Sequence, residues 1–150
     1  MTFSWINAVN ATAVFVLVIC SVIGQKKSGL PSMQSRSTFL NIMEQIGRYA
    51  SMLLMVLPLL PGLEFGFASV GVMTLWLLLT AILLLIYALL WTRVKSRGAV
   101  LYALAIVPVL LFLQNGILLR HWALLGAAVL FGICHVWITR AFCLTQGEDT

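Results

Sequence analysis

Long apolar runs recur along the whole chain, and they limit the fold more than any other feature of the sequence. Most approach or exceed the roughly 18 residues that a helix needs to cross a lipid bilayer. The runs do not alternate in polarity, as the strands of a membrane β-barrel would. With 62% hydrophobic and 9% charged residues, the chain has too few charges to cover a water-soluble globule. We therefore predict an all-α integral membrane protein, a polytopic transmembrane helix bundle.

The sequence predicts five membrane spans in a single transmembrane domain that occupies residues 1–150. Their approximate bounds are 3–24, 38–60, 69–91, 99–118 and 122–142. The first run has no basic residue before it, and Lys26 and Lys27 follow it. We therefore expect an uncleaved span rather than a signal peptide.

The distribution of basic residues predicts the orientation of these spans. Seven of them fall on one side of the predicted bundle: Lys26, Lys27, Arg36, Arg93, Lys95, Arg97 and Arg140. The opposite side carries Arg120, with Glu64 in its other loop. Because Lys and Arg are enriched in cytoplasmic loops, we expect the N-terminus outside and the C-terminus inside a bacterial inner membrane. The net charge of +5 then reflects loops that face anionic phospholipid headgroups, so it requires no nucleic-acid partner.

The second predicted span begins with polar residues that its length forces into the membrane. Residues 49–60 alone would extend about 18 Å as a helix, whereas the bilayer core is about 30 Å thick. The span must therefore start near Thr38, which places Glu44 about 9 Å and Arg48 about 15 Å deep. An arginine that faces lipid there costs about 2.5–3.5 kcal/mol, so both residues should face protein, water or an ion partner.

Asn41, Glu44, Gln45 and Arg48 recur with helical spacing, so they should form one stripe that faces inward. Glu44 and Arg48 are themselves an i, i+4 pair. Two interpretations remain open. In one, the pair neutralises itself and Arg48 reaches toward the cytoplasm. In the other, the stripe binds a ligand or handles a proton.

The last predicted span carries a possible partner for this stripe. Ala128, Gly132, His135 and Thr139 share one helical face, and the small pair Ala128/Gly132 allows another helix to approach closely. His135 should then lie inside the bundle at a depth close to that of Glu44. We predict that spans two and five pack antiparallel with these two side chains in proximity. A satisfied core histidine without a function is the alternative.

Other polar and aromatic residues give weaker signals. Tyr87 and Tyr102 fall at a depth similar to that of Glu44, where each could donate to Glu44 or to a ligand, or serve as an interface tyrosine. A second polar set lies nearer the outer side and should be solvated: Asn7, Asn10, Gln114, Asn115, Arg120 and His121. Four tryptophans near span ends predict aromatic belts: Trp5, Trp76, Trp91 and Trp122.

The sequence predicts no catalytic residue, no metal site and no cofactor. The two histidines are expected on opposite membrane faces, and no His/Cys/carboxylate cluster has metal-ligand spacing. Cys20, Cys134 and Cys143 form no C-x-x-C pair and should be small buried hydrophobes on the reducing side. The sequence contains neither a glycine-rich phosphate loop nor a G-x-S-x-G motif.

Two resemblances accompany these patterns. The segment NIMEQIGRYASMLLMV, with LEFGF and LLWTRVK after it, resembles small uncharacterised bacterial multi-span membrane proteins with an N-x-x-E-x-x-G-R element, which implies the architecture alone. Asn41 to Glu44 is also similar to an element of the membrane-associated eicosanoid and glutathione metabolism family, where such residues help to hold glutathione. This chain lacks that family's histidine before the asparagine and its proline after the glutamate, and it has a fifth predicted span.

Three functional hypotheses follow. In the first, a cytoplasmic-leaflet pocket of a transporter or lipid-binding module takes an anionic headgroup or solute: Arg48 supplies the charge, Asn41 and Gln45 orient the ligand, and Glu44 and His135 exchange a proton. The second is a membrane-embedded transferase that uses glutathione or a lipid donor. The third is a non-catalytic accessory subunit of a membrane complex. We expect a homo-oligomer or a partner membrane subunit.

Overall fold

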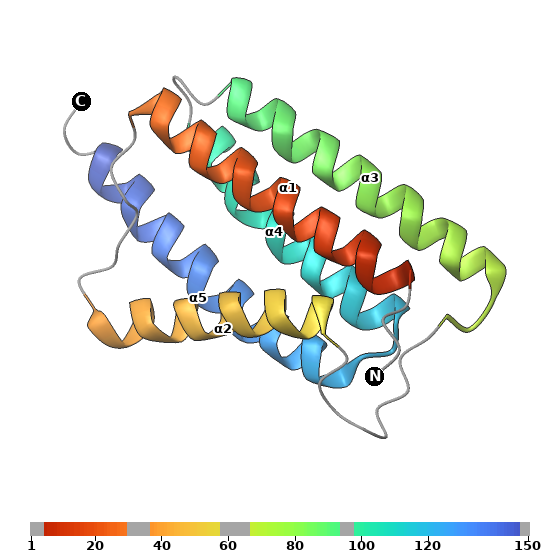
Figure 1. Cartoon of the computed structure of the whole chain (residues 1–150). Helices are drawn as coiled ribbons and strands as arrows, with labels where there is room; N and C mark the ends of the chain where they lie inside the picture. The colour runs from red at the N-terminus through yellow and green to blue at the C-terminus, as the bar shows by residue number, and fades with distance from the viewer. Residues whose placement is uncertain (1–4, 30–36, 58–66, 94–97, 148–150) are drawn as a thin grey trace.

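Five α-helices make up nearly all of the described chain, which in the computed structural model comprises residues 5–29, 37–57, 67–93 and 98–147 (Figure 1). They are α1 (Trp5–Ser28), α2 (Thr38–Val56), α3 (Val70–Thr92), α4 (Gly98–Leu118) and α5 (Trp122–Gly147). The all-α prediction is confirmed, and the predicted bounds differ mainly at the C-terminal ends of α1, α2 and α5. The predicted loop charges Arg36, Glu64, Lys95 and Arg97 lie outside the described residues.

Four of these helices are long and apolar enough to cross a membrane, namely α1, α3, α4 and α5. The chain therefore has the character of a multi-pass membrane protein. The predicted span 38–60 is not among the four, because α2 places Asn41, Glu44, Gln45 and Arg48 within 19 residues. Its helix ends at Val56.

Polar side chains start three of the helices by accepting free backbone N–H groups. The Ser37 hydroxyl accepts from the Leu40 amide at the start of α2, and Ser69 accepts from Val72 at the start of α3. At the start of α5 the imidazole Nδ1 of His121 accepts from the Leu124 amide at 3.0 Å. These residues therefore act as N-caps, and they fix where each helix begins.

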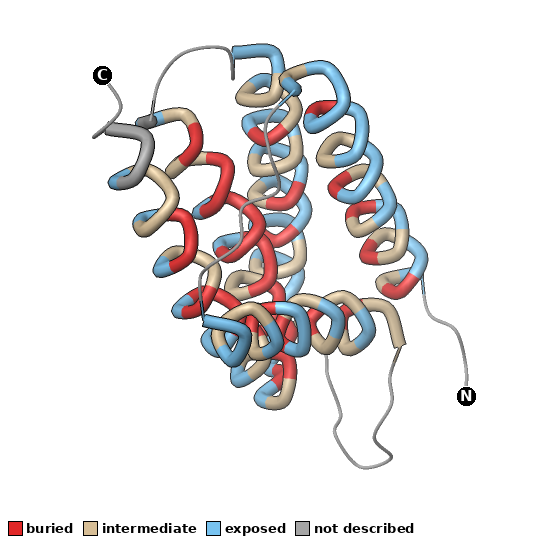
Figure 2. Tube along the Cα trace, turned by 90° about the vertical axis from the view of Figure 1, so that its left-hand side faces the viewer, coloured by how far each residue is buried: buried red, intermediate tan, exposed pale blue. Residues whose placement is uncertain are grey.

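α1 and α3 lie side by side and run in the same direction (Figure 1). The ring of Trp5 meets that of Trp76 at 6.2 Å near one end of the pair. Gly24 lies so close to Trp91 at the other end that a Cβ atom would overlap the indole. α4 and α5 then alternate in direction, whereas α2 lies obliquely across the bundle in both views (Figures 1 and 2). α2 packs chiefly against α5.

The core lies between the helices, and buried residues follow their facing sides (Figure 2). α4 is the central helix, since 61% of its most apolar segment is buried against 17% for α3. Phe112 of α4 packs edge-to-face on Phe131 of α5 at 5.7 Å. The aromatic-belt prediction is wrong for Trp76, which is fully buried, because it stands two turns into α3 and faces α4 rather than the bilayer surface.

Apart from Arg48, the described basic residues separate between the two ends of the bundle. Lys26 and Lys27 close α1, Arg93 follows α3 and Arg140 lies in the last two turns of α5; all four are exposed. These helix ends meet at the same end of the bundle (Figure 1). Arg120 is exposed in the turn between α4 and α5 at the opposite end. The charge asymmetry of the sequence is thus preserved in space.

Candidate functional site

Glu44 is buried at the crossing of α2 and α5, with 4% of its surface exposed. It belongs to a stripe that α2 turns inward, formed by Glu44, Gly47, Ser51 and Met55. This spacing of three or four residues is that of one helical face. An ionisable residue held this way inside a membrane bundle needs partners, because a lone buried charge is strongly disfavoured.

Two side chains supply those partners, and both reach the same carboxylate oxygen. The Arg48 guanidinium, one turn along α2, donates a hydrogen bond to Glu44 Oε1 and forms an ion pair with it. His135 of α5 places its Nδ1 atom 3.1 Å from Oε1. The predicted proximity of Glu44 and His135 is therefore confirmed, and α2 runs against the direction of α5 as expected (Figure 1). We call Glu44, Arg48 and His135 the Glu44 cluster.

Phe131 contacts two members of the cluster, His135 and Arg48. Its ring stacks on the His135 imidazole with centroids 4.7 Å apart and planes 24° apart. The Arg48 guanidinium carbon lies 5.9 Å from the centroid of the same ring, within the range of a cation–π contact. The ring therefore fixes the imidazole toward Glu44 and supports the arginine, and it is one turn before His135 on α5.

Gly47 allows the two helices to meet. A Cβ atom on Gly47 would lie 2.7 Å from the Phe131 backbone nitrogen and 2.9 Å from its Cα atom. The Ser51 hydroxyl, one turn later, donates to the Gly47 carbonyl at 2.7 Å, so this buried hydroxyl is paired. Gly47 and Ser51 are a small-xxx-small pair, the pattern at which helix backbones approach closely.

Replacing Gly47 by alanine is expected to destabilise the protein by about 1–3 kcal/mol, the usual range for overpacking. The added methyl group would meet backbone atoms of α5 rather than a flexible side chain. α2 must then move away and lengthen the Glu44–His135 contact. Thermal unfolding in detergent measures the loss. Gly126, whose Cβ would meet nothing within 4 Å, provides the control, and equal losses for Gly47→Ala and Gly126→Ala would contradict this account.

The solvent exposure of the side chains increases across the Glu44 cluster. The side chain of Glu44 is 5% exposed and that of Arg48 is 33% exposed. His135, at 19%, lies between them and stands at the midpoint of α5, 13 residues after Trp122 and 12 before Gly147. The cluster is therefore about 20 Å from either end of that helix. The Arg48 cation thus lies at the more exposed edge of the cluster, beside the less exposed pair of Glu44 and His135.

The other predicted site residues lie differently around this cluster. Asn41 is half-buried on α2, whereas Gln45 is exposed. The prediction that Gln45 belongs to the inward stripe is wrong, because the close approach at Gly47 rotates the buried face toward the glycine side. Tyr87 is buried on α3, where its ring meets Trp91 edge-on. Tyr102 is half-buried on α4, and no hydrogen bond joins it to the cluster within the described residues.

Three contributors to the site were missing from the sequence prediction. Phe131 stacks on His135, Gly47 permits the helix contact, and Ser51 continues the buried stripe. Gly132, expected to receive another helix, does so, but its neighbour is Val109 of α4 rather than α2. The Gly47-xxx-Ser51 spacing was the available sequence signal for the α2–α5 contact.

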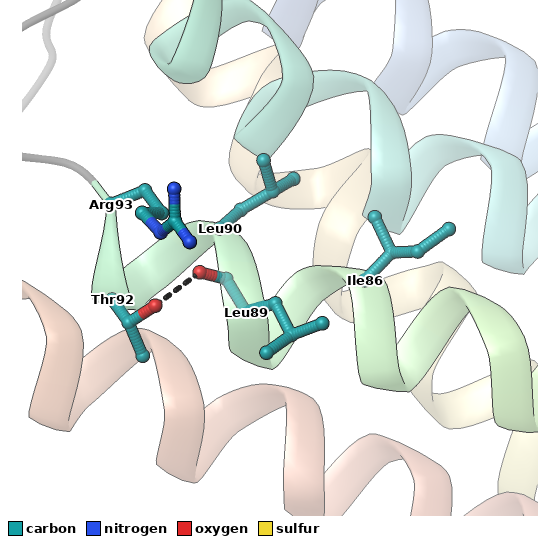
Figure 3. A pocket seen from close by; sticks show the side chains of 5 residues that line it. All are labelled: Ile86, Leu89, Leu90, Thr92 and Arg93. Carbon is teal, nitrogen blue, oxygen red and sulfur yellow. Dashed lines mark hydrogen bonds between the residues drawn. The ribbon is translucent and has the colours of Figure 1, made fainter.

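A shallow pocket of about 250 Å³ lies apart from the cluster, on α3 near its C-terminal end (Figure 3). Its lining residues are Ile86, Leu89, Leu90, Thr92 and Arg93. The Thr92 hydroxyl is occupied, since it donates to the Leu89 carbonyl at 2.7 Å. Apart from the Arg93 guanidinium, this wall is apolar and offers little to hold a reacting group in place.

The outer polar set is not solvated, contrary to the sequence prediction. Asn7, Asn10, Asn115 and His121 are at most 3% exposed. Among the six residues of that set, Arg120 alone is exposed. The two amides of α4 face α3, where Gln114 donates to Thr80 and Asn115 accepts from Trp76. Asn7 and Asn10 lie on the buried face of α1.

Within this set, His121 should make stability depend on pH. Burial lowers the pKa of His121 from its ordinary value, and protonation of Nδ1 would remove the cap on Leu124. Because the unfolded state takes up the proton at higher pH, stability is complete above about pH 6.5 and falls as the pH drops below it. We expect a loss of about 1 kcal/mol, the value of an N-cap. Thermal unfolding at neutral and acidic pH measures it. The variant His121→Asn retains a capping side chain and should lose this dependence; an unchanged dependence would assign it to another group.

Comparison with known proteins finds no matching family model, no matching curated protein and no matching solved structure. Within the described residues, no group of three or more His, Cys, Asp or Glu side chains could hold a metal ion.

Proposed function

We propose that the chain crosses a bacterial inner membrane five times, with its N-terminus outside. α1 and α3 run in the same direction, so residues 29–69 must return from one end of the bundle to the other. α2 lies within this stretch and crosses the bundle obliquely (Figure 1). The exposed Lys26, Lys27 and Arg93 share one end, which supports a cytoplasmic assignment of that end.

The proposed function is binding of an anionic group at Arg48 within the membrane, as in a proton-linked transporter or a lipid-binding module. One observation carries it: the Glu44 cluster holds a cation that is 33% exposed beside an acid that is 5% exposed. A purely structural ion pair needs no open side. The guanidinium has five N–H donors in a planar fork, which suits the oxygens of a phosphate or a carboxylate.

Charge balance couples that binding to a proton. Glu44 and Arg48 neutralise each other, so an arriving monoanion leaves the cluster with a charge of minus one. His135, in contact with Glu44 at 3.1 Å, can take up one proton and restore neutrality. Because unbalanced charge is strongly disfavoured in a low-dielectric interior, anion binding should carry about one proton with it.

Arg48→Met tests the proposal directly. Purified protein is titrated with inorganic phosphate, and separately reconstituted with phosphatidylglycerol or with phosphatidylcholine, while thermal unfolding is followed. We expect phosphate or phosphatidylglycerol to raise the Tm of the native protein and not that of the variant. A response to free phosphate indicates a solute site, and a response to phosphatidylglycerol alone indicates a headgroup site.

Arg140→Met is the matched control, because Arg140 is exposed on α5 and, within the described residues, no hydrogen bond or ion pair joins it to the cluster. It should retain the anion response. If Arg48→Met assembles normally and keeps the full response, the anion site is elsewhere. If the native protein shows no response to either probe, the cluster serves helix assembly alone and the accessory-subunit hypothesis gains.

A further inference from the structure

A second polar centre lies in the outer half of the bundle, apart from the Glu44 cluster. Asn10 of α1 is fully buried and Asn7 is 1% exposed. Asn7 Oδ1, both amide atoms of Asn10 and Gln114 Oε1 are enclosed, and none has a hydrogen-bond partner among the residues that the structure describes. Buried polar atoms are nearly always paired, and four unpaired atoms in one region call for a physical explanation.

Asn10 and Gln114 lie at one depth in the bundle, and Asn7 is about one turn before Asn10 on α1. Trp5 contacts Trp76, and Asn10 follows Trp5 by five residues as Thr80 follows Trp76 by four. Since α1 and α3 run parallel, Asn10 and Thr80 differ in depth by only about 1.5 Å. Gln114 of α4 donates through Nε2 to the Thr80 hydroxyl at 2.8 Å. The unpaired Gln114 oxygen and the Asn10 amide therefore belong to the same layer.

Asn115 in the same layer is a comparison case, because its side-chain oxygen and nitrogen both have hydrogen-bond partners. It is fully buried, as Asn10 is. Its Oδ1 accepts from the Trp76 indole at 2.7 Å, and its Nδ2 donates to the Leu111 carbonyl at 2.8 Å. The two asparagines thus differ in partners and not in burial, so the unpaired state of Asn10 is not a general property of the layer.

We propose that Asn7, Asn10 and Gln114 line an internal site for a neutral hydrogen-bonding guest, either ordered water or a small hydroxyl-bearing solute. The unpaired atoms include three oxygens and one NH₂ group, so the site offers acceptors and a donor together. A bound cation would leave Asn10 Nδ2 facing a positive charge, and an anion would face three amide oxygens. A hydroxyl group or a water molecule serves both kinds of atom. This site is independent of the proposed anion site.

The test measures which protons lie beside the Asn10 amide. The chain has four asparagines: Asn7, Asn10, Asn41 and Asn115. Selective ¹⁵N labelling of asparagine therefore gives four side-chain amide groups in the full-length protein in lipid nanodiscs. Magnetisation transfer is recorded from water, and then from the C–H protons of added glycerol, to each NH₂ group. Sequential assignment of the native protein identifies the signals without relying on a variant.

Asn115 is the internal control, because it is equally buried and fully bonded. We expect transfer to Asn10 to build up several-fold faster than transfer to Asn115. Transfer from water alone identifies water as the guest, and transfer from glycerol C–H protons that displaces the water signal identifies a hydroxyl-bearing solute. If neither source reaches Asn10 faster than Asn115, no guest occupies the layer and the proposal is wrong.

Discussion

A variant with Glu44 replaced by methionine is expected to unfold about 3 kcal/mol more easily than the native protein, the lower end of the cost of breaking a buried ion pair. Glu44 is the acid that contacts both Arg48 and His135. Its loss leaves the guanidinium without its counter-charge. Arg48 is one-third exposed, so part of that cost is relieved by its surroundings. Reversible unfolding in mixed micelles measures the difference.

The double variant Glu44→Met, Arg48→Met distinguishes two causes of instability: loss of the Glu44–Arg48 attraction, and the cost of leaving Arg48 without a counter-charge. With both charges removed and similar side-chain volume retained, stability should return to within about 1 kcal/mol of the native value. The same double variant should lose the anion response. If it is as unstable as Glu44→Met alone, the loss comes from packing at the α2–α5 crossing rather than from an unpaired arginine.

Replacing Asn115 by leucine is expected to cost about 3 kcal/mol through two lost hydrogen bonds and a buried indole N–H left without an acceptor. Asn115 joins α4 to α3 through Trp76, and both residues are fully buried. Bulk solvent does not reach either side chain. The free energy of unfolding of the single variant measures the cost.

Trp76→Phe provides the matched comparison, since phenylalanine removes the indole donor and keeps an aromatic ring. In the native background this change should destabilise the protein, whereas in the Asn115→Leu background the donor is already unpaired and its removal should cost much less. The double-mutant cycle therefore predicts a coupling of about 1–2 kcal/mol. Additive losses would show that the Trp76–Asn115 bond contributes nothing of its own.

The helical class, the positions of the helices and the Glu44–His135 contact were predictable from the sequence. The length of their apolar runs identified four of the helices. Because charged residues are scarce, each one within a predicted span stood out. Glu44 and His135 could be paired because both required a partner at comparable depth. The shape of the crossing was not predictable, since it depends on where Gly47 meets the Phe131 backbone.

Two errors have a common origin in treating polarity as a sign of where a residue faces. Gln45 is polar but exposed, and Asn10 is polar but fully buried. In water a polar side chain turns outward, but inside a membrane bundle the direction depends on which helix face packs, and packing follows small residues. Helical spacing around Gly47 and Ser51 would have been a better guide to the inward face of α2 than the positions of its polar groups.

The location of Gly47 within α2 has a mechanical consequence. It stands nine residues from Thr38 and nine from Val56, so the close approach to the α5 backbone at Gly47 divides the helix into two equal arms of about 14 Å. A 10° rotation of α2 about Gly47 would move the two ends of the helix about 2.4 Å in opposite directions. The same rotation would move Glu44, three residues from Gly47, by only about 0.8 Å. The Glu44–Arg48 ion pair therefore lies close to the point of rotation, where a tilt of α2 changes its contacts with α5 least.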